Sequence, residues 1–185
     1  MTVTDVNVVK SAIFERPDDA NKGTLGSLLC VCGSYGMAGA AVMSAKGALR
    51  TGIGLAKCAL PRSIYPIVAQ TILESVYYPL SENADGRISK VNVPFLVSES
   101  CKSSATLIGC GLGVCDDTLK IVLSLIENST TPLVLDADAL NCVAKQPEIL
   151  LRKKAPIIIT PHPGEMSRLT GLATPPVSYT HLTLP

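Results

Sequence analysis

The sequence carries almost no net charge and no extended basic segment. Its 16 Lys and Arg residues are balanced by 15 Asp and Glu, for a formal net charge of +1. The only clustered basic residues, Arg152 to Lys154, are typical of a helix carboxyl end, where the helix dipole favours positive charge. Proteins that bind nucleic acids or membrane surfaces carry a basic patch. The composition therefore predicts neither kind of partner.

Long apolar segments are also missing. No uninterrupted apolar run approaches the length of a membrane span, and the first ten residues lack the apolar core of a signal peptide. Hydrophobic residues make up 47% of the chain and charged residues 17%, a balance typical of a well-buried globular domain. A length of 185 residues suits one domain better than two. We expect a cytoplasmic protein.

Metal-binding and disulfide patterns are absent, although the chain has seven cysteines. The number is odd, and no two cysteines have the CxxC spacing of zinc sites. Cys30, Cys32, Cys58 and Cys110 lie inside apolar segments. Reduced and mostly buried thiols are therefore the favoured interpretation.

Short apolar runs alternate with helical patterns along the chain. Strands without polar alternation, separated by helices, are typical of a parallel sheet covered on both faces, so the fold class is α/β. The helix expected from residue 115 has an apolar stripe and a cap at Asp116 or Asp117. The expected strands are 27–33, 54–61, 73–80, 105–113, 131–140 and 155–161, and the expected helices are 37–52, 62–70, 115–128, 140–145 and 148–154.

The two ends of the chain differ from this pattern. We expect a lead-in over residues 1–20, one domain over 21–172 and an irregular tail over 173–185. The tail has no helical period and no closing element of a sheet. This pattern indicates a truncated domain, with foreign residues in the tail as an open interpretation.

Glycines follow two of the expected strands, and ligands of open parallel sheets bind beyond the carboxyl ends of strands. The segment GSYGMAGAA, 33–41, opens a helix with small residues, which suits phosphate or another anion. Close helix–sheet packing is an equally good explanation, and the spacing is not the GxGxxG of dinucleotide-binding proteins. Gly109, Gly111 and Gly113 either let backbone N–H groups approach a ligand or form a tight turn.

Polar side chains follow the last two expected strands. Asp136 is placed to hold a metal ion or a ribose hydroxyl, whereas Asp138 is better explained as a helix cap. His162 is the only histidine outside the last five residues, and the prolines at 161 and 163 hold it in extended backbone. A lone histidine is commonly structural, but this position at a strand end favours a ligand role. Glu165 falls in the first turn of the following helix, where a carboxylate is favourable.

Four segments occur in the order and spacing of one known family. They are NKGTLGSLLCVCGSYGMAGAAVMSAKGALRTGIGLAK, LIGCGLG, PLVLDADALN and ITPHPGEMSRLTG. From about Lys22 to Gly171 the chain resembles the ADP/ATP-dependent NAD(P)H-hydrate dehydratases of the ribokinase-like superfamily. The resemblance implies a three-layer α/β/α fold with a mostly parallel central sheet, incomplete at the C-terminus.

The same resemblance implies a repair enzyme that dehydrates hydrated NADH or NADPH at the expense of ADP or ATP, with Mg²⁺ assisting. It implies a homo-oligomer, a tetramer in the family. Asp136 and Glu165 match positions near the phosphates and the metal. The residues expected to contact or enclose the hydrated nucleotide are Ala40, Gly111, His162, Gly33, Gly36, Gly39 and Gly109.

The chain departs from the family pattern at two places. Cys110 stands where the family usually has proline, a change that should keep the turn. The family's later glycine-threonine-glycine-aspartate motif, which supplies its catalytic base and anion hole, occurs nowhere in the sequence. No catalytic residue is therefore assigned, and the chain alone is expected to be inactive. The alternatives are a ribokinase-like kinase of a small vitamin-precursor alcohol and a non-catalytic nucleotide-binding fragment.

Overall fold

The computed structural model describes residue 20 and residues 23–173. Apart from residues 20 and 173, the expected lead-in and tail lie outside the described part of the chain. Within that part, no helix is long and apolar enough to cross a membrane.

A six-stranded sheet forms the centre of the domain, with the strand order β3-β2-β1-β4-β5-β6. Every pair of neighbouring strands is parallel, and the single antiparallel contact among the described residues is an isolated bridge between Glu82 and Ile88. The predicted α/β class and parallel sheet are confirmed. The strands are β1 (Ser27–Val31), β2 (Leu55–Pro61), β3 (Val76–Leu80), β4 (Ala105–Ile108), β5 (Leu133–Leu135) and β6 (Ile157–Ile159).

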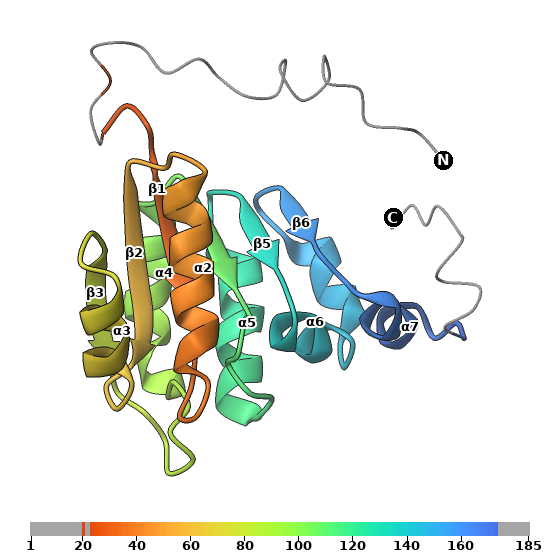
Figure 1. The fold of residues 1–185 in the computed structure, drawn as a ribbon. Coiled ribbons are helices and arrows are strands. Elements are labelled where there is room, and N and C mark those ends of the chain that lie inside the picture. The colour runs from red at the N-terminus through yellow and green to blue at the C-terminus, as the bar shows by residue number, and fades with distance from the viewer. Residues whose placement is uncertain (1–19, 21–22, 174–185) are drawn as a thin grey trace.

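Helices follow the strands and cover both faces of the sheet (Figure 1). Helices α2 and α3 lie against β1, β2 and β3, whereas α4 and α5 pack together on the opposite face. The α-helices are α2 (Ala38–Arg50), α3 (Tyr65–Thr71), α4 (Val93–Cys101), α5 (Asp116–Asn128), α6 (Asp138–Val143) and α7 (Pro163–Thr170), and the 3₁₀ helices are η1 (Lys90–Asn92) and η2 (Pro147–Arg152).

Strand β1 is covered on both faces, which explains why polar and apolar residues do not alternate in its sequence. Leu29 and Val31 belong to the apolar cluster that includes α5, while Cys30 and Cys32 belong to the separate cluster under α2 and α3. Side chains of a strand alternate between the two faces, so a strand covered on both faces needs apolar residues at every position. All four side chains are at most 2% exposed.

Several local predictions were wrong. Cys115, not Asp116 or Asp117, is the N-cap of α5, and its sulfur accepts a hydrogen bond from the backbone N–H of Thr118 at 3.5 Å. The helix expected at 148–154 is the 3₁₀ helix η2. Helix α4 was not anticipated, because the sequence between residues 87 and 104 has no clear period that marks a buried helix.

The strand order places a topological switch point between β1 and β4. From β1 the chain moves outward through β2 to β3, and from β4 it moves the other way through β5 to β6. Loops at such a point diverge to opposite faces and leave a crevice at the carboxyl ends of the strands. The candidate site is therefore expected where the loops after β1 and β4 meet.

Candidate functional site

The loops after β1 and β4 are joined by two hydrogen bonds. The backbone N–H of Gly33 donates to the carbonyl of Cys110 at 2.9 Å, and the hydroxyl of Ser34 donates to the carbonyl of Gly111 at 2.8 Å. Gly33, Ser34 and Gly111 are all buried. The switch point is thus a fixed junction of two backbone segments.

Gly109 and Gly111 make this junction possible. A Cβ atom on Gly109, whose φ is +129°, would lie 1.8 Å from the carbonyl oxygen of Asp136. A Cβ atom on Gly111, whose φ is +68°, would lie 2.7 Å from the Cβ atom of Ala40. Left-handed backbone and these close approaches both require glycine. The predicted residues Gly111 and Ala40 therefore lie together at the start of α2, whereas Gly109 lies against Asp136 and Ala139 at the start of α6.

A cavity of about 390 Å³ opens at the start of α2. Gly36 and Gly39 line it, and a Cβ atom built on either glycine would meet nothing within 4 Å. The N-cap residue Met37 provides no side-chain acceptor for the amides of the first helical turn. A helix start with free amides facing open space favours an anionic ligand group.

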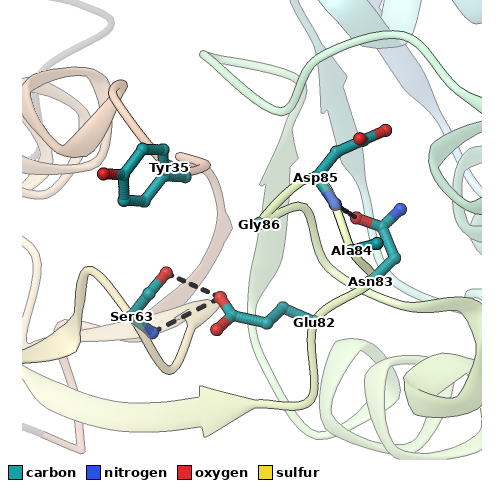
Figure 2. A pocket seen from close by; sticks show the side chains of 7 residues that line it. All are labelled: Tyr35, Ser63, Glu82, Asn83, Ala84, Asp85 and Gly86. Atoms are coloured by element: carbon teal, nitrogen blue, oxygen red, sulfur yellow. Dashed lines mark hydrogen bonds between the residues drawn. The ribbon is translucent and has the colours of Figure 1, made fainter.

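A second cavity, of about 480 Å³, adjoins the first and shares Tyr35 and Ser63 with it (Figure 2). Tyr35 is 75% exposed, and its backbone N–H donates to Gly86 at 2.9 Å. The carboxylate of Glu82 accepts hydrogen bonds from the hydroxyl of Ser63 at 2.6 Å and from its backbone N–H at 3.4 Å. Sequence reasoning missed these residues, although Ser63 follows β2 and Glu82 follows β3, so the strand-end rule would have found them.

Asp136 lies one strand further along the same edge. Its carboxylate accepts hydrogen bonds from the thiol of Cys110 at 3.2 Å and from the hydroxyl of Thr160 at 2.8 Å. These bonds connect the ends of β4, β5 and β6. The next residue, Ala137, has a φ of 47° and is the only non-glycine residue with positive φ in the described part of the chain. Such strain is retained where the surrounding structure fixes it, often at a functional site.

Asp138 does not cap α6 as predicted. The N-cap is Ala137, and the Asp138 carboxylate accepts a hydrogen bond from the backbone N–H of Gly113 at 2.8 Å. This carboxylate therefore holds the glycine loop after β4 against the start of α6.

His162 and Glu165 form a capping box at the start of α7. Nδ1 of His162 accepts from the backbone N–H of Gly164 at 3.1 Å, while its Nε2 lies 3.2 Å from Oε1 of Glu165. The other Glu165 oxygen accepts from the backbone N–H of His162 at 2.9 Å. Glu165 is buried, whereas the His162 side chain is 60% exposed. The geometry gives both residues a helix-capping role.

The sequence-predicted residues thus fall into three groups along the carboxyl edge of the sheet. One group forms the junction at the switch point, a second lines the cavity over α2, and the third caps α7 beyond Asp136 and Thr160. The described residues contain no group of three or more His, Cys, Asp or Glu side chains placed to hold a metal ion. The junction group consists of Gly33, Ala40, Gly109 and Gly111. The cavity group is Gly36 and Gly39, and the α7 group is His162 and Glu165.

The fold of this parallel sheet and its helices matches that of a ribokinase-like superfamily protein from Enterococcus faecalis, with a TM-score of 0.74 and 20% identity over 88% of this chain and 54% of that one. Residues 28–181 match the family model described as NAD(P)H-hydrate dehydratase, and the chain belongs to this family. It is 37% identical over 156 residues to the bifunctional NAD(P)H-hydrate repair enzyme Nnr of Thermofilum pendens, covering 84% of this chain and 30% of that protein.

Two further comparisons, one with a Bacillus subtilis sequence and one with a Bacillus subtilis crystal structure, support this assignment. The chain is 30% identical over 166 residues to the ADP-dependent (S)-NAD(P)H-hydrate dehydratase, covering 89% of this chain and 54% of that protein. Its fold matches the crystal structure of the ADP/ATP-dependent NAD(P)H-hydrate dehydratase co-crystallised with ATP and Mg²⁺, with a TM-score of 0.72 and 28% identity over 93% of this chain and 57% of that one. The chain thus spans about half the length of these dehydratases.

Proposed function

We propose that the chain supplies the substrate-binding wall of an enzyme that dehydrates hydrated NADH or NADPH at the expense of ADP or ATP. The single observation that carries this proposal is the cavity over Gly36 and Gly39, which lies beside the interlocked glycine loops of the switch point. A hydrated nicotinamide nucleotide carries phosphates that suit the amides at the start of α2. Membership of the dehydratase family supports the same substrate.

The chemistry of such a reaction suits a wall of this kind. In the proposed reaction, the substrate hydroxyl accepts a phosphoryl group from ADP or ATP, and loss of phosphate then restores the double bond. Phosphoryl transfer depends on positioning and on neutralising charge more than on covalent catalysis. The backbone amides of the first turn of α2, which no side chain caps, provide positioning and fixed partial positive charge at the carboxyl edge of the sheet.

Asp136 is the residue that would hold Mg²⁺. Mg²⁺ commonly binds one or two protein carboxylates together with substrate phosphates and water, so a closed cage of protein ligands is not needed. The partly exposed Asp136 carboxylate lies at the edge of the switch point and meets this requirement. The ion would neutralise negative charge on the phosphates. A homotetramer and a cytoplasmic location stay predictions.

A leucine at residue 39 tests the binding site. Gly39 lies in α2 without positive φ, so Gly39→Leu introduces no backbone strain and no contact within 4 Å at its Cβ atom. The leucine side chain would extend into the cavity. We expect hydrated NADH to bind the 185-residue chain and to bind Gly39→Leu at least about tenfold more weakly, a loss of ~1.4 kcal/mol, as measured by isothermal titration calorimetry.

Gly47→Leu is the matched control. Gly47 lies in the same helix, is exposed and also has an open Cβ position, but it lines neither cavity of the switch-point edge. Both substitutions should raise thermal stability slightly, because leucine is a better helix former than glycine. Equal affinity of the two variants, or preferential binding of a vitamin-precursor alcohol, would refute the proposal.

A further inference from the structure

The cavity of about 480 Å³ beside the one over α2 has a wall held in place by hydrogen bonds (Figure 2). Most of this wall is the turn over residues 82–87, in which the backbone N–H groups of Asp85 and Arg87 each donate to the side-chain oxygen of Asn83 at 3.1 Å. The side-chain amide of Asn83 donates to Asp117 in α5 at 3.1 Å. The turn is also bonded to the loop after β1 through Tyr35. The side chains of the turn therefore project from a backbone that is already fixed.

Glu82 supplies this cavity with a carboxylate that is oriented but not paired. Both hydrogen bonds from Ser63 go to the same oxygen, Oε2, and Oε1 has no hydrogen-bond partner among the described residues. In the same part of the chain, no ion pair involves Glu82. Asp85, the other carboxylate that lines the cavity, pairs with Arg87 at 3.6 Å. An unpaired acceptor oxygen of Glu82 is therefore open to a ligand.

Tyr35 makes one continuous binding site of this cavity and the cavity over α2. Its side chain lines both cavities and is exposed, and Ser63 is the other residue that they share. An exposed aromatic ring provides a face on which a base or another planar group stacks. The continuous site thus offers the uncapped amides at the start of α2, the Tyr35 ring and the Glu82 carboxylate. These three suit the phosphate, the base and the ribose of a nucleotide, respectively.

The strand order gives a bound dinucleotide a direction along the edge of the sheet. Asp136 follows β5, the uncapped amides follow β1, and Ser63 and Glu82 follow β2 and β3. In the proposed function, the pyrophosphate lies at these amides, and the nicotinamide ring reaches toward the phosphate donor on the Asp136 side of the switch point. The adenosine then lies on the opposite side, in the cavity of Tyr35 and Glu82, a placement that rests on the proposed function.

We propose that Glu82 binds the 2′-hydroxyl of the adenosine ribose and thereby selects hydrated NADH over hydrated NADPH. The free carboxylate oxygen accepts a hydrogen bond from that hydroxyl, as an acidic residue does in dinucleotide-binding α/β proteins. In hydrated NADPH, a 2′-phosphate replaces the hydroxyl, and its negative charge would face Glu82. An arginine accommodates a 2′-phosphate in such proteins. The 7 described residues that line this cavity include no basic side chain, and Arg62, which precedes Ser63, is not among them.

Calorimetric titration of the 185-residue chain with hydrated NADH and with hydrated NADPH tests this selection. We expect hydrated NADH to bind at least about tenfold more tightly. In Glu82→Gln, the amide oxygen still accepts from Ser63 but the charge is gone, so the two affinities should come within about threefold of each other. In Glu82→Arg the order should reverse, because a guanidinium pairs with the 2′-phosphate. Glu82 is exposed, so both variants should unfold near the wild-type temperature.

Glu74→Gln is the matched control. Glu74 is also exposed and its substitution removes the same charge, but it precedes β3 at the amino end of the strand, so the preference for hydrated NADH should not change. Equal binding of the two nucleotides by the wild type would overturn the selection and leave the proposed function intact. An unchanged preference in Glu82→Gln would overturn the role of Glu82. Failure of both nucleotides to bind would overturn the proposed function and the selection together.

Discussion

At the residue scale, His162 combines an exposed side chain with full hydrogen bonding. Its φ of −74° and ψ of 166° are extended, as the flanking prolines predict, and this backbone is the one that an N-cap requires. Nδ1 accepts a backbone N–H, so the neutral ring carries its proton on Nε2, facing Glu165. The exposed edge of the ring is left for contact with a ligand.

A substitution of His162 by asparagine separates the capping role from the binding role. Asparagine is a strong N-cap, so His162→Asn should keep the free energy of unfolding within about 0.5 kcal/mol, whereas His162→Ala should lose about 1 kcal/mol. If the imidazole contacts hydrated NADH, both variants should bind it several-fold more weakly. Urea unfolding and calorimetric titration measure the two effects. Unchanged affinity in His162→Asn would show that His162 acts only as a cap.

The sequence predicted which residues follow the strands, but it did not predict which residues cap the helices. The strand-end rule placed Gly109, Gly111 and Asp136 correctly at one edge. It did not reveal that Cys115 caps α5, because cysteine is not an ordinary capping residue. Burial opposes ionisation of this thiol, but hydrogen bonds from Thr118, Arg87 and Asp117 together outweigh burial and lower its pKa. Nor could it show that Asp138 binds Gly113, since that contact depends on how two loops meet in space.

At the scale of elements, one buried carboxylate connects α4 with the strands beneath it. Glu99, 9% exposed, lies 2.9 Å from the ammonium of Lys102, 3.1 Å from the hydroxyl of Tyr78 in β3 and 3.7 Å from the ammonium of Lys57 in β2. The hydrogen bond from Lys102 is the main reason that the pKa of Glu99 lies below its usual value. The Glu99 carboxylate thus joins α4 to β2 and β3.

This carboxylate predicts a pH dependence of stability. A lowered pKa in the folded state means that Glu99 stabilises the fold above its ordinary pKa of 4.5, and that this contribution is lost as the pH falls through the lower folded value. At pH 7, Glu99→Gln should cost about 1–3 kcal/mol, because it removes the only carboxylate that the described residues place beside the Lys57 ammonium and leaves it with the hydroxyl of Ser103. Urea unfolding between pH 7 and pH 3 should show the two proteins converging at the acid end.

Glu127→Gln is the matched control for Glu99→Gln. Glu127 pairs with Arg152 at 3.1 Å, but its side chain is 37% exposed, so the substitution should change stability by less than about 0.5 kcal/mol at any pH. A constant difference between wild type and Glu99→Gln across the acid range would show that the Glu99 charge does not contribute.

At the scale of the whole molecule, the two faces of the sheet are covered unequally. Over β5 and β6, Leu133, Leu135, Ile157 and Ile159 pack into the cluster on the α5 face. Between them, Ile158 lies on the other face and is 59% exposed. Sequence periodicity predicted the parallel sheet and the order of its strands, since buried strands and helices have distinct patterns, but it missed α4. Periodicity could not predict which parts of a sheet face remain exposed to solvent, because the helices that cover a strand can come from distant parts of the chain.

In the entire polypeptide, substrate binding and catalysis should be separable. We expect the 185-residue chain to bind hydrated NADH but not to regenerate NADH with either ADP or ATP, because no glycine-threonine-glycine-aspartate segment occurs in its sequence. A longer polypeptide that adds this segment should restore turnover by a factor of at least about 10³, since positioned charge and a base dominate such reactions. NADH absorbance measures the product directly. Turnover by the shorter chain would show that the described loops suffice for catalysis, whereas binding without turnover in both polypeptides would contradict the dehydratase reaction itself.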